Sequence, residues 1–89
     1  MRKSELNKYY EKLTERLNLQ MSYADAMHLL GQLTLALRHP RNIGSSAEVV
    51  RVIGATLANC VIAHLDGHVP DQILKDWQTV GFLKKGELN

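Results

Sequence analysis

The sequence predicts an all-α protein, a small bundle of about four helices in a single domain. Apolar residues recur at helical spacing in four separate segments, and helix start and stop signals bound these segments. The alternation of apolar and polar residues that would indicate strands is absent. The 89 residues are enough for one domain, and a content of 45% hydrophobic and 22% charged residues is typical of globular proteins.

The first predicted helix covers residues 4–17 and is amphipathic. Its apolar stripe comprises Leu6, Tyr9, Tyr10, Leu13 and Leu17. Lysines and glutamates alternate on the opposite side at a spacing that lets them pair. The glutamates oppose attraction to anionic lipid, so a membrane-surface helix is the less favoured interpretation. We expect this helix to dock its stripe on the second and third helices.

The second predicted helix covers residues 22–38. It begins at Ser22, whose hydroxyl can cap the first turn, with Asp25 three residues later. It ends before Pro40, because the residue that precedes a proline disfavours helical geometry. Its apolar face comprises Tyr23, Ala26, Met27, Leu30, Leu33 and Leu37.

The third predicted helix runs from a capping box formed by Ser45 and Glu48 to a stop at Gly67. Its core stripe is predicted to be Val49, Val50, Ile53, Leu57, Cys60, Val61 and Leu65. The remaining sides are almost as apolar, so the helix needs neighbours all round. We therefore expect it to be central in the bundle or at a dimer interface. Gly54 and Ala58 lie four residues apart, which allows another backbone to approach closely.

The fourth predicted helix covers residues 70–81, with Pro70 at its start and Asp71 near the positive end of the helix dipole. Its apolar face comprises Ile73, Leu74, Trp77 and Val80. Gly81 followed by Phe82 indicates a glycine stop with a hydrophobic residue folding back. The domain is thus expected to span residues 1–82, and residues 83–89 to form a charged, flexible tail.

Charge and cysteine content narrow the classes of function. Eleven Lys and Arg against nine Asp and Glu give a net charge of +2, which is low for a dedicated nucleic-acid binder. The single cysteine excludes an internal disulfide and fits a reducing compartment. Arg51, Asn59 and His64 interrupt the most apolar stretch, so no membrane span is expected. We expect a soluble, cytoplasmic protein.

The sequence offers little chemistry for catalysis. Cys60, His64, Asp66 and His68 are residue types that bind metals, but a second ligand pair is missing and no metal is expected. Capping explains the serines, and there is neither a glycine-rich phosphate loop nor a pair of carboxylates brought together by spacing. We therefore expect no enzyme activity and no cofactor.

A basic turn between the second and third helices is the main candidate contact site. It comprises Arg38, His39, Arg41, Ser45, Ser46 and Arg51, next to helix amides that can bind an anion. Alternatively, capping satisfies these amides and the turn only joins two helices. Trp77 is a secondary candidate for partner contact, although core packing is its more common role.

These observations favour a non-enzymatic regulatory or adaptor protein that acts by association with another protein. A homodimer would cover the third helix, and Val52, Ala55 and Ile62 are the predicted dimer contacts. The size and the lack of catalytic groups are typical of small accessory proteins of bacteria and their mobile elements. The alternative is a nucleic-acid-binding regulator with a dimeric basic surface around Arg38, Arg41 and Arg51.

Overall fold

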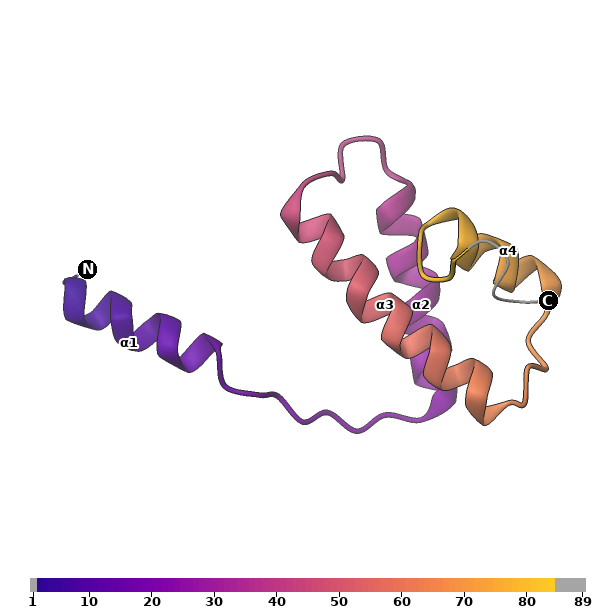
Figure 1. Cartoon of the computed structure of the whole chain (residues 1–89), viewed down its shortest axis with the longest axis horizontal. Helices are drawn as coiled ribbons and strands as arrows, with labels where there is room; N and C mark the ends of the chain where they lie inside the picture. Colours follow the sequence, from indigo (N-terminus) through magenta and orange to yellow (C-terminus); the bar gives the residue numbers. More distant parts are fainter. Residues whose placement is uncertain (1, 85–89) are drawn as a thin grey trace.

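The computed structural model describes residues 2–84 and confirms the all-α prediction. The described part of the chain contains four helices and no strand (Figure 1). The helices are α1 (Lys3–Leu13), α2 (Tyr23–Arg38), α3 (Ser45–His64) and α4 (Asp71–Thr79).

Helices α2 and α3 pack side by side as an antiparallel hairpin, and α4 lies beside them (Figure 1). The ring of Tyr23 at the start of α2 stacks on the ring of His64 at the end of α3, with centroids 3.7 Å apart. Leu30 of α2 and Val61 of α3 are completely buried between the helices. The predicted apolar face of α2 is thereby confirmed for Leu30 and its neighbours Ala26 and Leu37.

The segment after α4 completes the core. Gly81 adopts a positive φ of 91°, and the Phe82 amide donates to the Trp77 carbonyl at 2.8 Å, so the chain turns back at the predicted glycine stop. The Phe82 ring then packs against α3 at Gly54, where the missing side chain leaves room for it. Leu83 is buried as well, so it belongs to the core and not to a tail. Residues 85–89 of the predicted flexible tail lie outside the described residues.

Helix α1 stands apart from the other three helices, and the prediction that it docks on them is wrong (Figure 1). It ends at Leu13, earlier than predicted, and none of its residues is buried. The segment 14–22, which includes the exposed Leu17 and Leu19, separates it from α2. Its apolar stripe thus lacks a partner within the described chain.

The buried face of α3 differs from the predicted stripe. Val49, Ile53, Cys60 and Leu65 were expected in the core and are exposed. The buried residues are Ala47, Gly54, Ala58 and Val61. The small residues are selected because they let α2 and the Phe82 ring approach closely, which increases the number of dispersion contacts. In the single chain, α3 is therefore covered on one side only.

The two central helices also begin differently. Ser22 caps α2 as predicted, because its Oγ accepts a hydrogen bond from the Asp25 amide at 3.0 Å. The predicted capping box of α3 is wrong: Gly44 is the cap residue with φ 97°, and no side chain caps the helix. Ser45 lies one position inside the helix, and the Glu48 carboxylate pairs with Arg51 instead.

This difference predicts unequal effects of the same substitution. Ser22→Ala should lower the free energy of unfolding by about 1 kcal/mol, since a cap hydrogen bond is lost. Ser45→Ala should change it by less than about 0.5 kcal/mol, since no cap bond exists there. Urea titrations followed by the fluorescence of the single tryptophan, Trp77, measure both values. Equal losses would contradict the assignment of the caps.

Candidate interaction surface

The basic turn between α2 and α3 is held by its own hydrogen bonds. The Asn42 side-chain amide donates to the Ala36 carbonyl at 2.8 Å, and so closes the carboxyl end of α2. His39 Nδ1 accepts a hydrogen bond from the Arg41 amide at 3.2 Å, and the Asn42 amide donates to the His39 carbonyl. His39 therefore serves the structure of the turn.

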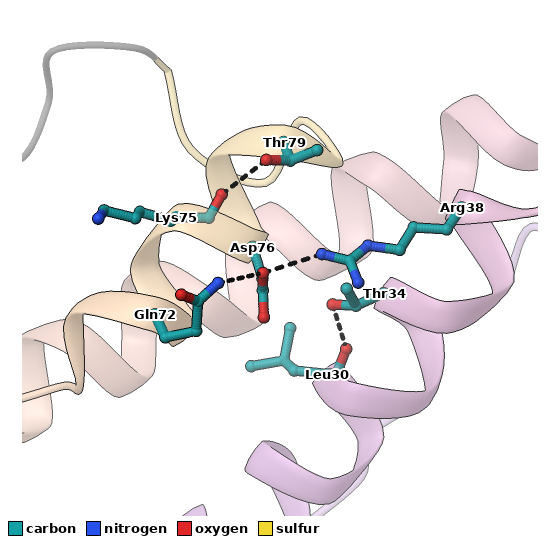
Figure 2. Close-up of polar contacts among 7 residues, drawn as sticks. All are labelled: Leu30, Thr34, Arg38, Gln72, Lys75, Asp76 and Thr79. Atoms are coloured by element: carbon teal, nitrogen blue, oxygen red, sulfur yellow. Dashed lines mark hydrogen bonds and ion pairs between the residues drawn. The ribbon is translucent and has the colours of Figure 1, made fainter.

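Two of the three predicted contact arginines are paired with carboxylates. Arg38 Nη2 lies 2.9 Å from Asp76 Oδ1 of α4, and the Gln72 side chain donates to the same oxygen at 3.1 Å (Figure 2). Arg51 pairs with Glu48, and its aliphatic part lies against Gly81. Within residues 2–84, the side chain of Arg41 has no acidic partner. The structure thus pairs two of the three predicted contact arginines with carboxylates and leaves Arg41 without one among the described residues.

Ser45 and Ser46 are both exposed in the first turn of α3. Their hydroxyls make no hydrogen bond to the helix amides, which differs from the capping role expected of them. The amides at this end accordingly have no side-chain acceptor from the cap residue, because Gly44 has none to offer.

An exposed, mainly apolar surface lies on the outward face of α3. We call it the outer stripe, and it comprises Val49, Val52, Ile53, Thr56 and Cys60. Val52 is 66% exposed and Ile53 is 50% exposed. These residues recur three and four positions apart and so share one side of the helix. A mainly apolar stripe of this kind marks an interaction site more often than isolated surface residues do.

The three predicted dimer contacts lie at different places around α3. Val52 is on the outer stripe. Ala55 is half-buried at the edge, and Ile62 packs against the core. Val52 is therefore joined on its face by Val49, Ile53 and Cys60, which the sequence placed in the core. Gly54 and Ala58, four residues apart, were the sequence signal for the buried side of α3, because small residues mark the side where another segment approaches closely.

A groove of about 410 Å³ adjoins the outer stripe. One wall is the segment that leads into α2, with Leu19, Met21 and Tyr23, and the other is α3, with Leu57 and Cys60. Its lining is mainly apolar. The groove continues the outer stripe sideways through Cys60, which belongs to both.

A second depression, of about 180 Å³, lies between α2 and α4. Met27, Leu35, Ile73 and Trp77 contribute its apolar lining, and the Arg38–Asp76 pair lies at its edge. Trp77 is only 2% exposed, so core packing and not partner contact is its role in the single chain.

Two further classes of site have limited support in the structure. No group of three or more His, Cys, Asp or Glu residues that could hold a metal ion occurs between residues 2 and 84. In contrast to the sequence expectation, α3 is long and apolar enough to cross a membrane, by length and composition alone. Helices of soluble proteins satisfy the same criterion.

No protein-family model, curated protein or solved structure matches the chain.

Proposed function

We propose that the protein is a small non-enzymatic adaptor or regulator that acts by protein–protein association, as a homodimer built on the outer stripe of α3. The observation that carries the proposal is the exposure of Val52 and Ile53 in the middle of the longest helix. In water, such a stripe favours association because burial removes apolar area from solvent.

The total surface area supports a second copy. The chain exposes 7314 Å². A compact monomer of 10.0 kDa is expected to expose roughly 5,200 Å². The excess is larger than the ~800 Å² that each partner contributes to a standard interface, and α1 with the segment after it contributes to the excess. The chain alone thus leaves more surface in water than its size requires.

We further propose that a different protein, the partner that the homodimer would bind, contacts the basic turn through Arg41. An acidic surface would fit there, since this guanidinium has no carboxylate partner within the described residues. The nucleic-acid alternative is less well supported. It needs Arg38, Arg41 and Arg51 on one surface, whereas Arg38 and Arg51 each pair with a carboxylate.

Val52→Asp tests the homodimer. The wild-type chain is expected to show twice its mass of 10.0 kDa by light scattering at micromolar concentration. The variant places a charge on the outer stripe, and burial of that charge without a partner is unfavourable. We expect the dimer dissociation constant to rise at least about tenfold, which corresponds to about 1.4 kcal/mol.

Leu35→Asp is the matched control. Leu35 is 61% exposed on α2, close to the value of Val52, but it lies away from the outer stripe. This variant should remain dimeric. A monomeric wild-type chain would overturn the proposal, and so would sedimentation of the chain with phospholipid vesicles in place of dimerisation.

A further inference from the structure

Helix α1 is a second apolar face that lacks a partner. Leu6, Tyr9, Tyr10 and Leu13 are all exposed, with Leu13 at 61%. Their spacing places them within one side of the helix, while lysines and glutamates occupy the other side. Lys12 on that polar side forms an ion pair with Glu15, which follows the end of the helix.

A helix of this length needs packing to persist. It has 11 residues, and isolated helices shorter than roughly 12–15 residues are at best marginally stable in water. Its stability must therefore come from burial of the apolar stripe, and no part of the described chain buries it. The helical conformation of α1 points to a binding surface elsewhere.

The outer stripe of α3 matches the apolar stripe of α1 in chemistry and is long enough to receive it. At 1.5 Å per residue, the outer stripe extends about 16 Å from Val49 to Cys60, and the stripe of α1 extends about 10 Å from Leu6 to Leu13. Both faces are apolar and exposed. The groove beside Cys60 provides room for the large tyrosine rings next to the stripe.

We infer that α1 of one copy docks on the outer stripe of α3 of a second copy, so that the two chains exchange arms. This inference rests on the proposed homodimer and names the contact that forms it. Each chain offers one arm and one acceptor face, so a symmetric pair satisfies both of them twice.

The shape of the chain favours a second copy over docking within one chain. The segment 14–22 leads away from the hairpin, and α1 lies at its far end (Figure 1). The chain measures 52 Å along its longest axis and has a radius of gyration of 16.0 Å. A compact domain of this size would have about 12 Å. When extended, the segment 14–22 reaches roughly 30 Å, which is enough to cross to a neighbouring molecule.

The exchange makes a prediction that a simple contact between two α3 helices does not. Leu6→Asp disables the arm, and Val52→Asp disables the acceptor face. Each variant alone should be monomeric where the wild type is dimeric, with a dissociation constant raised at least about tenfold. An equimolar mixture should recover the dimeric mass at higher concentration, because the intact arm of the Val52 variant can dock on the intact face of the Leu6 variant.

Asn7→Asp is the matched control, since it places the same charge next to Leu6 but off the apolar stripe, and it should remain dimeric. Light scattering of the full-length variants and of the mixture measures all outcomes. A dimeric Leu6→Asp variant, or a mixture that stays monomeric, would overturn the arm exchange while the homodimer stands. A monomeric wild type would overturn both the arm exchange and the homodimer. If Leu6→Asp then increased the reactivity of Cys60 toward thiol reagents, this result would indicate that α1 covers α3 of its own chain.

Discussion

Gly54→Ala is expected to destabilise the protein by about 1 kcal/mol, although alanine is the better helix former. A β-carbon at position 54 would overlap the ring of Phe82, which is buried against the backbone of α3. Overpacking of this kind costs about 1–3 kcal/mol, with a central value of about 2 kcal/mol, and the gain of about 1 kcal/mol in helix propensity offsets only part of this cost. Urea titration at a fixed protein concentration measures the loss.

Gly31→Ala is the control for this prediction. Gly31 lies within α2, and a β-carbon there would meet no atom within 4 Å. The same substitution should therefore stabilise the protein by about 0.5–1 kcal/mol. In a Phe82→Ala background, Gly54→Ala should become neutral or stabilising, because the overlapping ring is gone. A stabilising Gly54→Ala in the wild-type background would show that Phe82 does not pack where the structure places it.

Leu30→Ala is expected to have the largest effect on stability, a loss of about 2–5 kcal/mol. Leu30 of α2 is 0% exposed. Its truncation therefore leaves a cavity, in addition to the loss of buried apolar surface. The total stability of a small domain is only about 5–15 kcal/mol, so this loss should lower the melting temperature by many degrees.

Leu35→Ala removes the same atoms from the same helix. Because Leu35 is 61% exposed, its loss should be below about 0.5 kcal/mol. Thermal unfolding followed by circular dichroism compares the two variants. Similar losses would mean that the face of α2 that points to the core has been assigned wrongly.

The sequence was informative where a helix carries a polar side. In α2 the polar residues Asp25, His28 and Gln32 leave one direction for burial, and Leu30 is buried as predicted. The end of α4 was equally readable, because Gly81 and Phe82 form a local pattern whose hydrogen bonds lie within a few residues.

The orientation of α3 could not be read in the same way. Its own apolar residues occur on almost every side of the helix, so their periodicity does not single out one face for burial. Which face of α3 is buried depends on Phe82. This residue comes from a segment far along the chain, and its ring needs the space at Gly54. The stripe of large apolar residues, such as Ile53, therefore did not identify the buried face of α3.

The position of α1 could not be predicted from its own apolar stripe. Its stripe shows that Leu6 and Leu13 favour burial, but not which surface covers them. The basic turn shows the same limit, since Arg38 is neutralised by Asp76, a residue of another helix. Ion pairs between distant segments leave no local signal in the sequence.

The second copy that we propose on the outer stripe of α3 would also shield Cys60 from thiol reagents. Cys60 is the single cysteine of the chain, and it is exposed on this stripe in the single-chain structure. The rate of thiol labelling of the unmodified protein should be slow at high concentration and should rise at least about tenfold as dilution separates the copies. A labelling rate that is fast, and equal at every concentration, would show that no second copy covers the outer stripe.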